Sequence, residues 1–143
     1  MDPLRELDDC HYLAYRRSDR FITRLYDKHL AAAGLTSSQF TLLMSLKVSP
    51  RINTLALADA MVMERTTLVR ALKPMRDAGW IKASGSGSGR GIVFELTKAG
   101  MEKVDEGFPL WSAAKKQFED TVGEGKANRI RTSNLTVARL AQA

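Results

Sequence analysis

Residues 80–96 read WIKASGSGSGRGIVFEL, a Ser/Gly run between two short apolar segments. In the second segment Ile92, Phe94 and Leu96 recur at every second position, which is the period of a β-strand. A lone strand needs a partner, and residues 80–83 on the other side of the run are the nearest candidate. The sequence therefore predicts a β-hairpin whose tip is the Ser/Gly run.

Two short helices are predicted immediately before this hairpin. Thr54 is expected to cap the first, LALADAM at 55–61. A VME turn then leads to the second, residues 65–78, which Gly79 ends. Two short helices joined by a tight turn are the outline of a helix-turn-helix. A hairpin after such a pair is a wing, and this one carries Arg90 near its tip.

The second helix has two distinct faces. At about 100° per residue, Leu68, Leu72 and Met75 share an apolar face. The opposite face carries short hydroxyls and long cations, and such side chains approach base edges closely or donate two hydrogen bonds to guanine O6 and N7. An ordinary amphipathic surface helix shows the same pattern, so that alternative stays open. The residues expected to meet DNA, on this helix and on the wing, are Arg65, Thr66, Thr67, Arg70, Lys73 and Arg90.

Helices are also predicted before the helix-turn-helix. A long first helix is expected over 7–33, ended by Gly34. Thr36 and Gln39 have the spacing of a capping box, which opens a further helix that stops before Pro50.

The tail after the hairpin is predicted to be helical as well. Thr97 is expected to cap a helix from Lys98 that is interrupted at 107–109 by the Gly-Phe-Pro sequence. A last helix is expected over about 126–141, and its apolar side chains exceed what one subunit can cover, which suggests a partner subunit. Packing of this helix on the chain's own first helix is the alternative.

Length and charge limit the class of protein. The 143 residues fit one domain, and the formal net charge is +6. Residues 62–100 hold seven basic and three acidic side chains, hence +4 of that total, around the predicted helix-turn-helix and wing. A localised basic patch is typical of a protein that binds a polyanion, although a solvated basic surface is the alternative.

Several other classes are disfavoured. A single cysteine excludes an internal disulfide, and with two histidines it cannot furnish a structural zinc site. The acidic N-terminus and the lack of a long apolar run predict a cytoplasmic protein with no membrane partner. The Ser/Gly run lacks the lysine of a phosphate-binding loop and is followed by a strand, so neither an enzyme nor a cofactor is predicted.

The chain resembles the MarR family of bacterial transcription regulators. The resemblance rests on GLTSSQFTLL, TLALADAMVMERTTLVRALKPMRDAGWI and RGIVFELTKAG in this order, with RRSDRFITRLYDKHL similar to the family's first helix. It implies a mainly α fold with a small β-hairpin wing, a winged helix-turn-helix with N- and C-terminal dimerisation helices. Residues 1–143 would then form a single MarR-like domain, with about 36–97 as the DNA-binding region and about 1–35 and 98–143 as dimerisation helices.

The resemblance also implies a function. Such proteins bind pseudo-palindromic operators in double-stranded DNA as homodimers, usually as repressors released by a small ligand or by oxidation. A winged-helix module that binds proteins and never touches DNA is the remaining alternative. Two departures from the family pattern bear on affinity: Ser88 stands where an Asp commonly precedes the wing arginine, and Glu64 stands where Asp commonly caps the recognition helix.

An effector pocket is implied by the same resemblance. Apolar and aromatic walls with one cation would suit a small acidic aromatic compound, although a plain core is the alternative. The residues that map onto this pocket are Cys10, Ala14, Arg17, Phe40, Met44, Phe108 and Trp111.

Cys10 and Arg17 each have two interpretations. Cys10 is either a small apolar residue at an interface, which we favour, or a peroxide sensor. Arg17 falls on the apolar stripe of the first helix, so it should be paired. Its partner is either a carboxylate of the same protein, which we favour, or an acidic effector.

Overall fold

The computed structural model describes residues 2–85 and 91–142. In chain order, its helices and strands are a 3-10 turn at Arg5–Leu7, α1 (His11–Leu30), a second 3-10 turn at Ala31–Ala33, α2 (Ser37–Val48), α3 (Thr54–Met61), α4 (Arg65–Asp77), β1 (Ile81–Ser84), β2 (Val93–Leu96), α5 (Lys98–Val122) and α6 (Glu124–Leu140). The fold is mainly α with a two-stranded antiparallel hairpin directly after two short helices, so the predicted winged helix-turn-helix is confirmed.

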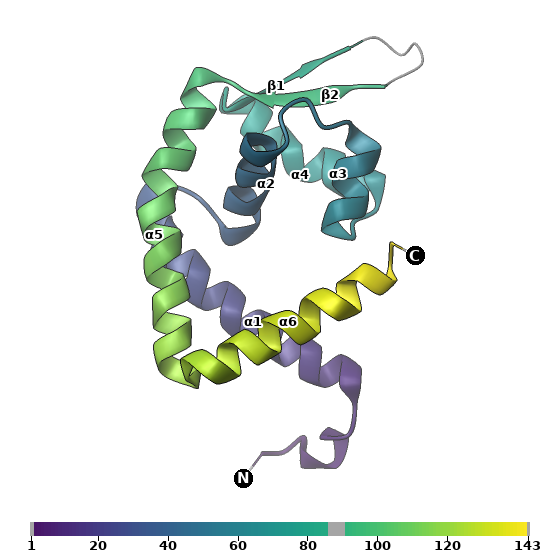
Figure 1. Cartoon of the computed structure of the whole chain (residues 1–143), viewed down its shortest axis with the longest axis vertical. Coiled ribbons are helices and arrows are strands. Elements are labelled where there is room, and N and C mark those ends of the chain that lie inside the picture. The colour runs from purple at the N-terminus through teal and green to yellow at the C-terminus, as the bar shows by residue number, and fades with distance from the viewer. Residues whose placement is uncertain (1, 86–90, 143) are drawn as a thin grey trace.

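Helix α5 connects two parts of the molecule (Figure 1). At its N-terminal end lie α2, α3, α4 and the hairpin, and at its C-terminal end it meets α6 at the lower left of the view. α1 and α6 lie on the side away from the hairpin. The end of α6 reaches back toward α3, where Gln142 Nε2 donates to the Asp59 carbonyl at 3.0 Å.

The core lies beneath the helix-turn-helix. Leu68, Leu72 and Met75 are fully buried, which confirms the apolar face predicted for α4. They pack in one cluster with residues of α2, α3, the strands and α5, chiefly Phe40, Leu43, Leu46, Leu57, Ile81, Phe94 and Val104. This cluster fixes the position of α4 relative to the hairpin.

Several predicted helix ends are confirmed. Thr36 and Gln39 form both hydrogen bonds of a capping box, each at 3.1 Å. Thr97 caps α5 by accepting from the Gly100 N–H at 3.1 Å. Gly34 and Gly79 end their helices with φ of 70° and 79°, a left-handed conformation that favours glycine.

Several boundaries differ from the prediction by a few residues. The helix predicted over 7–33 is shorter, because Cys10 is its N-cap and the chain tightens into a 3-10 turn after Leu30. The first strand is β1, Ile81–Ser84, rather than 80–83, and α6 begins two residues early, at Glu124.

The predicted Thr54 cap is wrong. The side chain of Asn53 accepts from the Ala56 N–H at 2.8 Å and caps α3. The Thr54 hydroxyl is instead buried and donates to the Ile92 carbonyl at 3.0 Å. Because Thr54 is hydrogen-bonded to the wing, Asn53 and not Thr54 caps α3.

The predicted interruption at 107–109 is also wrong, because α5 runs unbroken through Gly107 and Pro109. A Cβ on Gly107 would lie 2.8 Å from Phe40 Cδ2 and 3.0 Å from Leu35 Cδ1. This glycine allows α2 to approach α5 closely and does not end the helix.

Candidate nucleic-acid interface

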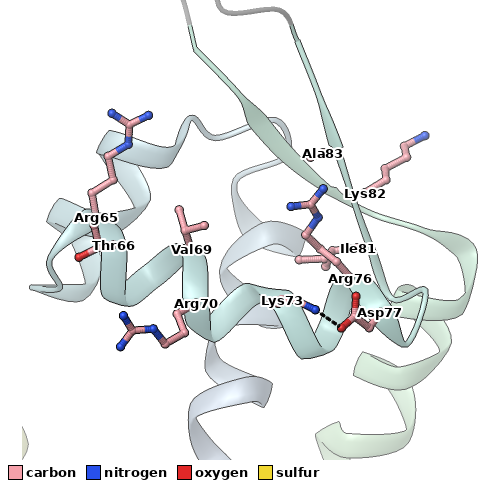
Figure 2. Close-up of a pocket in the computed structure, with 10 residues that line it drawn as sticks. All are labelled: Arg65, Thr66, Val69, Arg70, Lys73, Arg76, Asp77, Ile81, Lys82 and Ala83. Atoms are coloured by element: carbon pink, nitrogen blue, oxygen red, sulfur yellow. Dashed lines mark hydrogen bonds and ion pairs between the residues drawn. The ribbon is translucent and has the colours of Figure 1, made fainter.

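A solvent-exposed cleft of about 940 Å³ runs between α4 and strand β1 (Figure 2). One wall is the outward face of α4 and the other is the first wing strand. The residues that line it are Arg65, Thr66, Val69, Arg70, Lys73, Arg76, Asp77, Ile81, Lys82 and Ala83. Five of these are cationic and one is a carboxylate, so the cleft carries a net charge of +4.

The sequence of α4 explains why these side chains converge. At about 100° per residue, the seven that belong to α4 fall within an arc of about 140°, opposite the buried stripe of Leu68, Leu72 and Met75. Burial of that stripe therefore turns the basic face outward. Figure 2 shows Arg65, Val69 and Arg76 on the side of α4 toward the hairpin, and Arg70 on the other flank.

One ion pair lies within the cleft. Lys73 Nζ is 2.8 Å from Asp77 Oδ2, one helical turn further along α4, and both side chains are well exposed. Within the described part of the chain, no carboxylate lies within 4.0 Å of Arg65, Arg70 or Arg76. These three guanidinium groups are therefore open to an external anion.

Four of the six residues predicted to meet DNA line this cleft, namely Arg65, Thr66, Arg70 and Lys73. Thr67 is exposed on α4 but is not among the lining residues. Arg90 and the tip predicted at 84–89 lie outside the described residues, except for Ser84 and Gly85.

Six side chains of the cleft were not predicted, namely Val69, Arg76, Asp77, Ile81, Lys82 and Ala83. Val69 and Arg76 lie on the same arc of α4 as the predicted residues, so a helical wheel drawn from the sequence could have identified them. Lys82 belongs to β1, and its position depends on the register of the hairpin, in which it pairs with Glu95.

The base of the wing is fastened to the loop before α3. The Thr54 N–H and hydroxyl both donate to the Ile92 carbonyl, at 3.3 and 3.0 Å. An isolated bridge pairs Asn53 with Val93, and the Phe94 N–H donates to the Ile52 carbonyl at 3.4 Å. This isolated bridge adds one residue pair beside β2 and ties the wing to the helix-turn-helix.

Glu95 strengthens this junction. Its carboxylate forms an ion pair with Arg51 of the same loop, and its second oxygen lies 3.8 Å from Lys82 Nζ on β1. Arg51 has a φ of 62°, a left-handed conformation that a non-glycine residue adopts only when its surroundings hold it there.

The seven residues predicted for an effector pocket separate into two groups. Phe40, Phe108 and Trp111 are brought together, with ring centroids 6.0 Å apart for Phe40 and Trp111 and 5.6 Å apart for Phe108 and Trp111. Met44 is half-buried against the same core. The other group lies on the N-terminal part of α1 and comprises Cys10, Ala14 and Arg17.

Arg17 has a partner within the chain. Its Nη1 lies 2.8 Å from Asp2 Oδ2, and the Leu4 N–H together with this guanidinium holds the pKa of Asp2 below its usual value. The side chain is exposed and not buried on an apolar stripe as predicted. Cys10 is half-buried, and its Sγ accepts from the Leu13 N–H at 3.5 Å.

A smaller cavity of about 330 Å³ lies where α1, α5 and α6 meet. Trp111 lines it, but none of the other six predicted pocket residues does. Its remaining walls are Ile22, Tyr26, Lys115, Phe118, Glu119, Ala127 and Arg131.

Residues 2–85 and 91–142 offer neither a metal site nor a membrane span. This part of the chain holds no cluster of three or more His, Cys, Asp or Glu side chains suited to a metal ion. None of its helices combines the length and the apolar character needed to cross a bilayer.

Comparisons with known proteins agree with this geometry. The model of the MarR family matches residues 35–87. The crystal structure of the Mycobacterium tuberculosis transcriptional regulator MosR is 31% identical, with a TM-score of 0.78, over 94% of this chain and 98% of that chain. MosR in complex with DNA gives 29% identity and a TM-score of 0.82, over 93% and 96% of the two chains.

A more distant relative shares the fold. The transcriptional repressor CouR bound to a 23-mer DNA duplex is 20% identical, with a TM-score of 0.83, over 96% of this chain and 99% of that chain. A comparison with curated protein sequences gave no match. Because MosR is matched over nearly its whole length at 31% identity and the family model covers the helix-turn-helix, this chain belongs to the MarR family.

Proposed function

We propose that this protein is a sequence-specific DNA-binding transcription regulator that binds a pseudo-palindromic operator as a homodimer. The observation that carries the proposal is the cleft between α4 and β1, with five cations and one carboxylate on its walls. The MarR family is one of transcription regulators and not of enzymes. A regulator of this kind acts on the chromosome, so we propose a cytoplasmic location.

The chemistry of the cleft suits a DNA duplex. A helix fits the major groove of B-DNA, and α4 presents guanidinium groups on the face that would enter it. Arg70, which is free of carboxylates in the described part of the chain, is the candidate for a two-hydrogen-bond contact to guanine O6 and N7. Arg65, Arg76 and Lys82 would meet phosphates on either side.

The wing would supply a second contact. We propose that Arg90, which lies outside the described residues, enters the adjacent minor groove. Support comes from the base of the wing, where Thr54 and Glu95 fix β2 and β1 against the loop before α3. A hairpin fastened in this way would keep β1 and β2 in a constant direction relative to α4.

Exposed apolar side chains on α1 and α6 support the homodimer. Within α6, Ala127 is the buried residue, while Ile130, Leu135, Val137 and Leu140 are all more than a third exposed. Phe21 is exposed on α1. We propose that residues 1–143 act as one domain, in which about 36–97 bind DNA and the helices of about 1–35 and 98–143 pair with those of a second subunit.

We propose repression as the mode of action and a small acidic aromatic compound, or oxidation, as the releasing signal. CouR is described as a transcriptional repressor and has been solved with p-coumaroyl-CoA, an aromatic acyl thioester. In this chain the aromatic group of Phe40, Phe108 and Trp111 is the part of the predicted pocket that suits such a ligand.

The test is DNA binding at two salt concentrations. Genomic fragments bound by the protein would be selected, and affinity for the recovered operator measured by gel shift for wild type, Arg70→Ala and Lys47→Ala. The control Lys47 is an exposed cation near the end of α2, outside the cleft and outside the helices proposed to pair the subunits. We expect steep weakening with salt, with log K falling by about 0.9 per phosphate contact per log unit of salt. Arg70→Ala should cost about 1–3 kcal/mol and Lys47→Ala little.

The protein-binding alternative gives a different result. A winged-helix module that never touches DNA would recover no preferred fragment and would show the same weak binding for all three proteins. That outcome would contradict the proposed function.

A further inference from the structure

Val69 is an apolar side chain in the middle of the basic face of α4. Its exposed fraction is 41%, although its neighbours Leu68 and Leu72 are fully buried. A β-branched residue in a helix costs side-chain entropy, and at this exposure Val69 gains only part of the burial of a core residue. Helix formation and core packing therefore do not fully explain a valine at this position.

The position of Val69 is central to the cleft. On the wheel it lies between Arg65 and Arg76 on one side and Thr66 and Lys73 on the other. Figure 2 shows its two methyl groups directed away from the α4 axis toward the open side of the cleft. Any duplex that meets these cations therefore meets the Val69 methyls as well.

The other apolar side chains of the cleft are less accessible. Ile81 is 3% exposed and Ala83 is half-buried, because both belong to β1 at the back of the cleft. Among the described lining residues, Val69 is therefore the large apolar side chain that an incoming ligand would touch.

The major-groove edges of the bases offer one apolar group, the C5-methyl of thymine. The other groups there are hydrogen-bond donors and acceptors, which a valine would leave unsatisfied at a cost. We propose that Val69 is a specificity-determining residue that packs its methyls on a thymine C5-methyl in each half-site. This inference rests on the proposed function and adds the base that the Val69 position selects.

The side chains next to Val69 limit which base pair it could contact. Arg70 follows Val69 and points to the other flank of α4, so the two side chains would reach different base pairs of one half-site. Lys73 is held by Asp77 at 2.8 Å, which keeps its ammonium group off the Val69 methyls. The thymine would therefore accompany the guanine that Arg70 is proposed to contact.

The test is a double-mutant cycle between protein methyls and a base methyl. A binding sequence would be selected from a random duplex library with wild-type protein. Each thymine of the half-site would then be replaced in turn by deoxyuridine, which lacks only the C5-methyl. Affinities would be measured for wild type, Val69→Thr, Val69→Ala and the control Val48→Ala. Val48 is 74% exposed at the end of α2 and does not line the cleft.

We expect one thymine per half-site at which deoxyuridine weakens wild-type binding by about fourfold, the equivalent of burying one methylene-sized group. Val69→Ala should bind the thymine duplex several-fold more weakly and lose the sensitivity to deoxyuridine at that position. Val48→Ala should retain both affinity and sensitivity. Val69→Thr keeps the side-chain shape and one of the two methyl groups, so it should keep part of the sensitivity to deoxyuridine that Val69→Ala loses.

The outcomes separate the inference from the proposed function. If wild type selects a sequence but no thymine is sensitive to deoxyuridine, the Val69 proposal is wrong while DNA recognition stands. The same holds if Val69→Ala remains as sensitive as wild type. If wild type selects no sequence at all, the proposed function fails and the inference fails with it.

Discussion

Replacing Gly100 by alanine should destabilise the protein, although the same change inside a helix is usually favourable. Gly100 is buried in the first turn of α5, and a Cβ there would fall on the carbonyl oxygen of Trp80 and 3.1 Å from Leu96 Cδ2. That carbonyl accepts from the Thr97 N–H at 3.0 Å, so α5 cannot move away without loss of this hydrogen bond.

The expected change in the free energy of unfolding is the sum of three contributions. Overpacking against backbone costs about 1–3 kcal/mol, and the hydrogen bond contributes about 0.5–1.5 kcal/mol. The better helix propensity of alanine returns about 0.5–1 kcal/mol. The free energy of unfolding should therefore fall by about 2 kcal/mol, which lowers the urea midpoint by about 1 M at a typical slope.

The assay is urea unfolding followed by circular dichroism, at one protein concentration because dimerisation would couple to unfolding. The matched control is Gly125→Ala in α6, where a new Cβ would meet only the flexible end of Arg129 at 3.4 Å. The control should be as stable as wild type or more so, by up to about 1 kcal/mol. A Gly100→Ala protein at least as stable as wild type would refute the reasoning.

Three further substitutions test other features. Burial raises the pKa of Tyr26 above its usual 10.0 in the folded protein. The free energy of unfolding should therefore fall as pH rises from the pKa of the unfolded chain through that of the folded protein. Urea midpoints between about pH 9 and 11 should show this fall in wild type and not in Tyr26→Phe. Thr54→Val should lower the free energy of unfolding by about 1–2 kcal/mol, because the Ile92 carbonyl loses the buried hydroxyl; unchanged thermal unfolding would contradict this role. Asp77→Asn frees Lys73 for a phosphate, so operator binding should tighten and its salt slope should steepen by about 0.9; fluorescence anisotropy over a salt series measures both, and a shallower slope would rule the idea out.

Local patterns were enough to predict the order of the elements. Capping residues, glycine stops and the alternation at 92–96 depend on neighbours a few positions away, so the sequence displays them directly. The capping box of Thr36 and Gln39 and the αL glycine at Gly79 show this. The cationic face of α4 is local in the same sense, since burial of one stripe turns the opposite one outward.

Features that depend on distant contacts were mispredicted. Gly107 has the appearance of a helix breaker until the Phe40 ring is placed against it. From the sequence, Thr54 and Asn53 are equally good caps, but in the fold the Thr54 hydroxyl donates to the Ile92 carbonyl. Arg17 was expected on a buried stripe, but within one chain that part of α1 is exposed and Asp2 pairs with it.

In the candidate site, too, the residues set by local sequence were predicted and one that depends on distant contacts was not. Arg65, Thr66, Arg70 and Lys73 were identified from α4 alone, and they line the cleft. Lys82 was missed because its place opposite α4 depends on the turn after Gly79 and on the hairpin register. These depend on how two elements pack, which no single-helix pattern contains.

The isolated bridge between Asn53 and Val93 has a consequence for aggregation. A two-stranded sheet has two open edges, each able to recruit the sheet of another molecule and start an ordered aggregate. Here the loop before α3 occupies the outer edge of β2, and the outer edge of β1 borders the cleft and carries Lys82. The chain itself therefore covers part of the β2 edge, and the positive charge of Lys82 disfavours pairing at the β1 edge. Both features disfavour edge-to-edge pairing between the hairpins of separate molecules.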